Sequence, residues 1–213
     1  MKLNLNKLRI TLRNTLISVW EYVIPIWKIS GLFKKIKSKK DLENFIQERS
    51  AHVTQTTLYG YLKTRIGVKY IAMMEDEKFL KSINIAKWNI YMVALADCAF
   101  YVFSYLISEK NLRENNCKEI FLKILEDEKL NGLSDEIFES GKKNFLKRIE
   151  TVNFSNYHLD DPFKESGEAL YYWSPIADEL KSLDKKIVLN SIHLKWRLMR
   201  DEFKKLTKDL KFS

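Results

Sequence analysis

Side chains that could carry out chemistry are few in this sequence, and their spacing matches no known type of site. His52, His158 and His193 stand far apart, without the spacing of a helical zinc or di-iron centre. The chain also has no G-x-x-x-x-G-K-[ST] loop, no G-x-G-x-x-G loop and no G-x-S-x-G nucleophile turn. We therefore expect no catalytic residues, no metal and no cofactor.

One short polar cluster lies at residues 157–161. His158 is followed by Asp160 and Asp161, and a histidine beside carboxylates could serve as a base or bind a metal. Because Asp161 precedes Pro162, it is more economically the N-cap of a helix, with His158 in a loop. A small hydrolase built on His158 and Asp160 remains an alternative.

A second cluster interleaves aromatic and basic residues between positions 57 and 67. Lys63 and Arg65 could contact a phosphate or a carboxylate while Tyr59 stacks on a ligand. In the structural interpretation, which the apolar periodicity favours, the two basic side chains face water or pair with Asp97. If the cluster is functional instead, its polar site consists of Tyr59, Lys63, Arg65 and Asp97.

The positive charge of the chain is concentrated at its beginning. The whole chain has 37 basic and 28 acidic residues, a net charge of +9. Residues 1–40 hold ten basic residues and one acidic residue, a net charge of +9. The rest of the chain has 27 basic and 27 acidic residues and is neutral. We therefore predict two parts, a basic amphipathic arm at 1–40 and a neutral helical domain at 41–213.

The arm contains the residue types that favour a membrane interface or another anionic partner. Amphipathic aromatic rings lie at headgroup depth, and lysines bind anionic lipid. The candidate residues are Trp20, Trp27, Lys28, Lys34, Lys35, Lys37, Lys39 and Lys40. Leucines at helical spacing before Pro25 also allow the arm to pack on its own domain, which is the commoner arrangement.

The elements that position these residues are expected to be helices. Only 6 glycines and 3 prolines occur in 213 residues, too few for the turns of an all-β fold. Apolar periodicity predicts a single irregular all-α bundle. The expected helices are 41 to about 67 (interrupted at Gly60), 69–81, 85–107, 115–126, one after Ser134, and about 175–210 starting at Ser174-Pro175, with 151–174 mostly a loop.

Two of these helices have distinctive patterns. Within the helix at 85–107, the run from 90 to 107 has one charge, Asp97, and approaches the length of a membrane span; we interpret this helix as the buried centre of the bundle. Asp97 then needs an arginine, a tyrosine hydroxyl or water as its partner. The last helix has an early apolar stripe and a late one, so its two ends are expected to meet different neighbours. Their members are Ile176, Leu180, Leu183 and Ile187, then Val188, Ile192, Trp196, Met199, Phe203 and Leu206.

Three segments carry a resemblance. TLYGYLKTRIG (57–67), SINIAKWNIYMVALADC (82–98) and SPIADELKSLDKKIVLNSIHLKW (174–196) resemble an uncharacterised bacterial family of helical proteins. Some members of that family bear the name esterase. The resemblance spans about residues 45–200, implies one coherent helical domain and transfers no catalytic residue.

The resulting hypothesis is a non-enzymatic accessory or adaptor protein that binds another protein. Its basic arm would lie at an anionic membrane surface, and binding of nucleic acid or the ribosome is a less favoured alternative. Cys98 and Cys117 form no paired motif, and no secretory signal is apparent, so we expect a cytoplasmic location at the inner face of the membrane.

Overall fold

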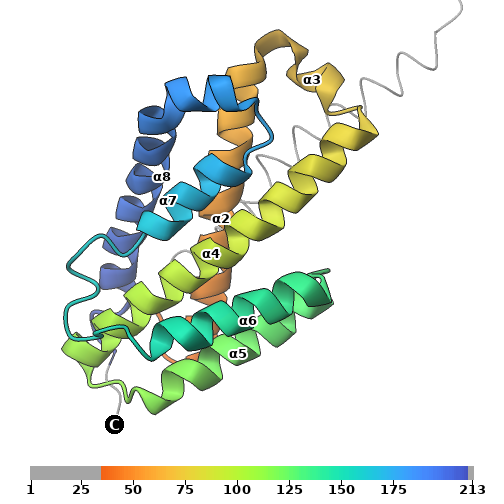
Figure 1. The fold of residues 1–213 in the computed structure, drawn as a ribbon. Helices are drawn as coiled ribbons and strands as arrows, with labels where there is room; N and C mark the ends of the chain where they lie inside the picture. The colour runs from red at the N-terminus through yellow and green to blue at the C-terminus, as the bar shows by residue number, and fades with distance from the viewer. Residues whose placement is uncertain (1–34, 211–213) are drawn as a thin grey trace, which may run out of the picture.

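The computed structural model describes residues 35–210, and every regular element in that range is a helix (Figure 1). The elements are α2 (Lys39–Ile66), a 3₁₀ turn at Gly67–Lys69, α3 (Tyr70–Met73), α4 (Glu77–Lys110), α5 (Asn115–Leu130), α6 (Asp135–Ile149), α7 (Lys164–Trp173) and α8 (Asp178–Leu206). The prediction of an all-α bundle with a long last helix and an apolar central helix is confirmed.

Helix α4 lies at the centre of the arrangement. It packs against α2, α6 and α7, while α8 packs on α7 and α2. Figure 1 shows the α5–α6 pair on one side of α4, with α7 and α8 on the other. The chain enters and leaves the bundle at one end, since the backbone N–H of Ile36 donates to the carbonyl of Leu206.

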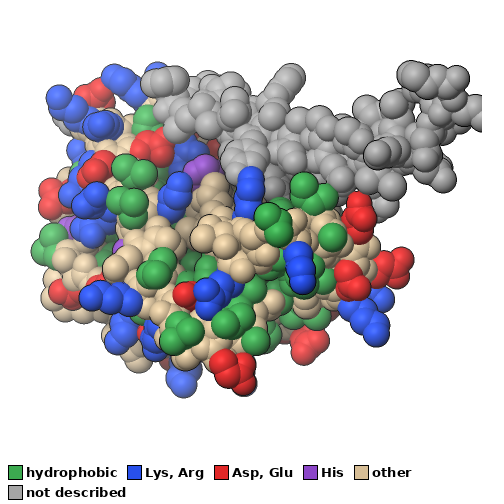
Figure 2. Space-filling model, turned by 90° about the horizontal axis from the view of Figure 1, so that it is seen from above, with side chains coloured by type: hydrophobic (Ala, Val, Ile, Leu, Met, Phe, Trp, Pro, Cys, Tyr) green, Lys and Arg blue, Asp and Glu red, His purple; other side chains and the backbone are tan. Residues whose placement is uncertain are grey.

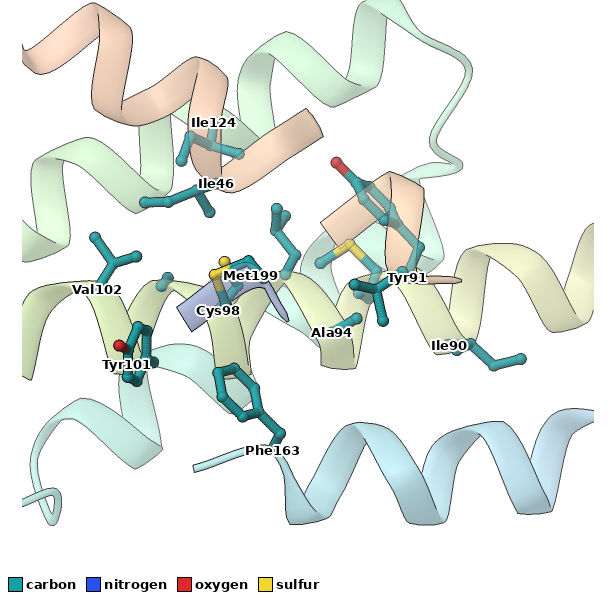
Figure 3. Packing of buried hydrophobic residues seen from close by; sticks show 14 of the residues in the cluster. Ile46, Ile90, Tyr91, Ala94, Cys98, Tyr101, Val102, Ile124, Phe163 and Met199 are labelled. Carbon is teal, nitrogen blue, oxygen red and sulfur yellow. The ribbon is translucent and has the colours of Figure 1, made fainter. Parts of the chain in front are cut away.

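The apolar composition of α4 follows from this central place. The six consecutive residues from Cys98 to Phe103 all have no exposed surface. Figure 3 shows Ile46 of α2, Ile124 of α5 and Met199 of α8 gathered around this helix. By length and composition alone α4 could cross a membrane, but 78% of its most apolar stretch is buried within the protein.

Local capping explains where α2, α4 and α6 begin. Ser38 and Asp41 form a reciprocal capping box before α2, and Asp76 accepts from the N–H of Phe79 before α4. Ser134 accepts from the N–H of Ile137 and caps α6, so the helix predicted after Ser134 is confirmed. Ile36 is buried and α2 begins at Lys39, so residues 36–40 form part of the helical body.

Three expectations about α2, α3 and α4 are wrong. Helix α2 continues through Gly60, and a Cβ at that position would meet no atom within 4 Å, so neither a break nor close packing occurs there. The helix expected over 69–81 ends at Met73, because Asp76 caps a new helix. The central helix is correspondingly longer than predicted.

The region from 151 to 178 also differs from expectation. The predicted loop contains the ten-residue helix α7, and Asp161 does not cap it. Ser174 donates its hydroxyl to the carbonyl of Leu170, so it ends α7 instead of starting the next helix. Helix α8 begins at Asp178, three residues after Pro175, and ends at Leu206.

Candidate functional site

The polar site predicted from residues 57–67 and Asp97 does not assemble. Arg65 pairs with Asp184 of α8 at 3.1 Å, and the hydroxyl of Tyr61 donates to the same carboxylate. Asp97 pairs with Arg148 instead. Lys63 is exposed, and Tyr59 packs at the edge of the core. Asp97 and Arg65 therefore belong to separate polar groups.

The described lysines of the basic segment are largely matched by acids of the body. Lys35 lies 2.5 Å from Asp209, and Lys39 lies 3.5 Å from Glu119. Lys40 contacts both Asp127 and Glu43. Lys37 is exposed, and within residues 35–210 it forms no ion pair. Trp20, Trp27, Lys28 and Lys34 lie outside the described residues.

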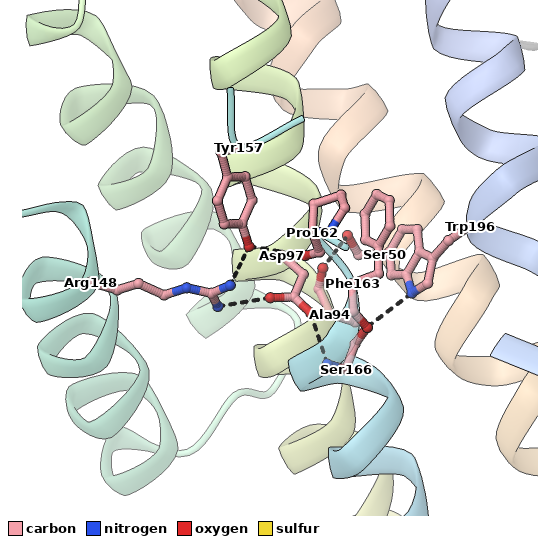
Figure 4. Close-up of polar contacts among 9 residues, drawn as sticks. All are labelled: Ser50, Ala94, Asp97, Arg148, Tyr157, Pro162, Phe163, Ser166 and Trp196. Carbon is pink, nitrogen blue, oxygen red and sulfur yellow. Dashed lines mark hydrogen bonds and ion pairs between the residues drawn. The ribbon is translucent and has the colours of Figure 1, made fainter. Parts of the chain in front are cut away.

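The best-connected polar group surrounds Asp97 at the middle of α4 (Figure 4). Arg148 of α6 donates from Nη1 to Oδ1 of Asp97 at 2.7 Å, and from its other terminal nitrogen to the hydroxyl of Tyr157. The backbone N–H of Ser166 donates to Oδ2 at 2.8 Å. The indole of Trp196 on α8 donates to the hydroxyl of Ser166 at 2.9 Å. The carboxylate of Asp97 thus connects α4 with α6 and α7, and Ser166 extends the group to α8.

Asp97 serves as a cap supplied from a distant part of the chain. Helix α7 has no capping side chain of its own, and Ser166 lies in its first turn. A carboxylate at a helix amino terminus satisfies a free N–H and complements the helix dipole. The sequence could not reveal this cap, because its acceptor lies 69 residues away.

Burial dominates the electrostatics of this group. It raises the pKa of Asp97 to about 6, although Arg148 and the N–H of Ser166 favour the charged form. Burial also raises the pKa of the Tyr157 hydroxyl. Both carboxylate oxygens of Asp97 accept from protein donors, and the side chain has no exposed surface. The arrangement suits holding helices together better than transferring protons to a substrate.

His158 is also held internally. Its Nδ1 lies 2.9 Å from the hydroxyl of Ser104, which accepts from the backbone N–H of His158 and donates to the carbonyl of Phe154 at 2.6 Å. The single hydroxyl hydrogen is therefore directed away from the imidazole. Ser104 has no exposed surface, and Asp161 lies 3.7 Å from Nδ1 of His193. This geometry does not favour the hydrolase alternative.

The outer face of α8 carries a row of exposed apolar side chains, which we name the α8 stripe. It consists of Leu180, Leu183, Ile187, Leu194 and Leu198. Leu183 is 75% exposed and Ile187 is 68% exposed, so the early stripe is largely uncovered among the described residues, although Ile176 packs against the core. The late stripe is buried as expected, apart from the half-buried Leu206. Seen from above, apolar side chains lie among lysines and arginines at the surface (Figure 2).

The comparisons with known proteins add no further constraint. No family model, no curated protein and no solved structure matches this chain. The bacterial helical family therefore stays a prediction. Within residues 35–210, no three histidine, cysteine, aspartate or glutamate side chains lie together as a metal site would require.

Proposed function

We propose that this protein is a non-enzymatic adaptor that binds an amphipathic helix of a partner protein through the α8 stripe. The observation that supports the proposal is the exposure of an apolar row along one side of a helix. Singly scattered apolar residues are normal on a surface, but a contiguous row is typical of an interaction site.

The spacing of the stripe fits a helical partner. Leu180, Leu183, Ile187 and Leu194 follow the alternating three- and four-residue intervals of a heptad, with Asn190 at the intervening position. At 100° per residue the stripe occupies about 60° of the helix circumference, and it extends for about 27 Å. A second helix could pack along it in the way that coiled-coil helices pack.

Charge beside the stripe indicates the character of the partner. Lys186, Arg197 and Lys204 are exposed and fall on one side of α8, where Glu179 and Asp201 are the exposed acids. A helix with apolar heptads and acidic flanking residues would therefore complement this surface.

A synthetic peptide provides the test. We expect a 21-residue peptide with leucine heptads and glutamate flanks to bind at least about tenfold more tightly than its lysine-flanked counterpart. The double variant Leu183→Glu/Ile187→Glu should lose this binding and keep its circular dichroism spectrum, because both side chains are exposed. Val68→Glu is the matched control, since Val68 is 99% exposed at a turn between α2 and α3.

Two outcomes would contradict the proposal. Equal binding by the wild type and the double variant would exclude the stripe as the site. A wild-type chain that dimerises in sedimentation experiments, together with a monomeric double variant, would show that a second copy occupies the stripe.

We propose in addition a cytoplasmic location in which residues 1–37 approach anionic lipid. The support is the excess charge of this segment with Trp20 and Trp27, and the unpaired ammonium group of Lys37 within the described residues. Flotation of the full chain with phosphatidylserine vesicles should fall when Lys28, Lys34 and Lys37 are replaced by glutamate. Absence of flotation in both proteins would remove this part of the proposal.

A further inference from the structure

A cavity of about 380 Å³ lies between α2, α4 and the end of α5, away from the α8 stripe. Its size is in the range of cavities that hold small organic molecules. The lining combines amide side chains such as Gln47 and Asn131 with two glutamates, a lysine and the indole of Trp88. A lining of this composition offers both hydrogen bonds and a flat aromatic surface.

Glu128 is the most unusual group in this cavity. Its side chain is buried, and its Oε1 accepts from the hydroxyl of Tyr91 at 2.7 Å and from Nε2 of Gln47 at 3.1 Å. Its Oε2 accepts from the amide of Asn131 at 3.2 Å, which leaves that oxygen one further lone pair. All three donors are neutral, and no lysine or arginine among the described residues pairs with Glu128. Buried carboxylates are normally compensated by a cation.

Thr54 supplies an independent observation. It is 1% exposed, lines the same cavity, and its hydroxyl has no hydrogen-bond partner within residues 35–210. Thr56 and Thr57 on the same helix instead donate to backbone carbonyls one turn earlier. A buried hydroxyl without a protein partner is rare in native proteins and is usually satisfied by a water or another bound molecule.

The aromatic wall and the charge of the lining favour a cation. Trp88 is half-buried, and its ring meets the edge of Tyr91 with centroids 5.9 Å apart. The ammonium group of Lys87, the neighbouring residue, lies 5.0 Å from the centroid of the Trp88 ring. Glu48, Glu128 and Lys87 give the lining a net charge of 2 − 1 = 1 negative unit.

We propose that this cavity binds a small hydrophilic amine. Its ammonium group would donate to the free lone pair of Glu128, and an adjacent hydroxyl or amine of the ligand would bond to Thr54. The proposal does not depend on the adaptor function, because the two surfaces involve different helices.

Matched ligand pairs test the role of the ammonium group. The full chain labelled with ¹⁵N would be titrated with ethanolamine, putrescine and glucosamine, and with ethylene glycol, 1,4-butanediol and glucose as neutral counterparts. The indole N–H signal of Trp88, assigned with a Trp88→Phe variant, should shift in a saturable way with at least one amine. Its neutral counterpart should bind at least about tenfold more weakly. Equal response to amine and neutral partner, or no response to any amine, would overturn the proposal.

Three variants separate binding from folding. Glu128→Gln should weaken amine binding at least about tenfold, as expected for loss of a charged hydrogen bond. Thr54→Val should weaken binding about threefold to tenfold without lowering the melting temperature, because the hydroxyl has no partner in the protein. Glu126→Gln, an exposed position on the same helix, is the control and should bind like the wild type. If Glu128→Gln does not fold, unchanged affinity in Thr54→Val would still contradict the proposed site.

Discussion

At the scale of single residues, Asp97 combines a stability cost with an organising role. A carboxylate in the centre of an apolar helix is expensive to bury, and its raised pKa reports that cost. In return it fixes Arg148 of α6 and the first turn of α7 to α4. Removing either Asp97 or Arg148 would leave the other charge uncompensated, so this group specifies how three helices meet.

The pH dependence of stability tests this interpretation of Asp97. Its pKa is about 6 in the folded state against an ordinary 3.8, so the folded protein binds this proton more tightly than the unfolded chain. The resulting stabilisation is complete below pH 3.8 and is lost as the pH rises through 6, a change of about 3 kcal/mol. The free energy of unfolding of Asp97→Asn, measured relative to that of the wild type, should therefore rise by about that amount between pH 4 and pH 7. Urea unfolding across this range measures the difference, and parallel curves for the two proteins would contradict it.

Ser104 shows how one hydroxyl can hold a loop. It bonds to Phe154 and His158 and thereby fastens the segment before α7 to the central helix. Ser104→Ala should lower the free energy of unfolding by about 1–3 kcal/mol, because two buried polar groups lose their partner. Hydrogen exchange at the His158 amide should accelerate in parallel. Ser108→Ala is the control, since exposed Ser108 contacts the same segment and water can replace its hydroxyl.

At the scale of elements, the helices differ in where their end signals come from. Helices α2, α4 and α6 start at capping side chains that neighbour them in the sequence. Helix α7 depends on Asp97, and α8 begins without a capping side chain. The sequence predicts α5 and α6 within a few positions, whereas for α7 it predicts only a helix start at Asp161 and neither the length nor the cap of the helix.

Gly60 offers a test of helix propensity without a change in packing. It lies inside α2, is exposed, and a Cβ there would meet no atom within 4 Å. Gly60→Ala should raise the free energy of unfolding by about 0.5–1 kcal/mol, because alanine loses less backbone entropy on forming a helix. Gly132→Ala should be destabilising instead, since Gly132 adopts a φ of +96° that suits glycine. Denaturant titration compares the two, and a destabilised Gly60→Ala would show that α2 needs a glycine there.

At the scale of the whole molecule, a single apolar cluster extends from Ile36 to Leu210. Every long helix in the described range contributes to it, and α4 contacts members on three sides. No division into separately packed parts is apparent between residues 35 and 210. The body therefore has the structure expected of one cooperative unit.

Cooperative unfolding is the corresponding prediction. Circular dichroism at 222 nm reports all helices, while Trp196, 1% exposed, reports the core between α7 and α8. The contribution of Trp196 to the fluorescence is the part of the signal that is absent from a Trp196→Phe variant. This contribution should change at the same urea midpoint as the circular dichroism signal. A separate earlier loss of helix signal would show that the α5–α6 pair unfolds independently.

Apolar periodicity, scarce glycine and proline, and local caps determined the helical class, the central helix and most helix positions by themselves. These features act within one or two turns of the chain, so they can be read without knowing the fold. Which cation faces Asp97, what caps α7, and that Leu183 and Ile187 remain exposed were decided only by tertiary packing. The same was true of the cavity around Glu128. Each of these depends on side chains from separate helices, and helical periodicity identifies an apolar face without identifying what covers it.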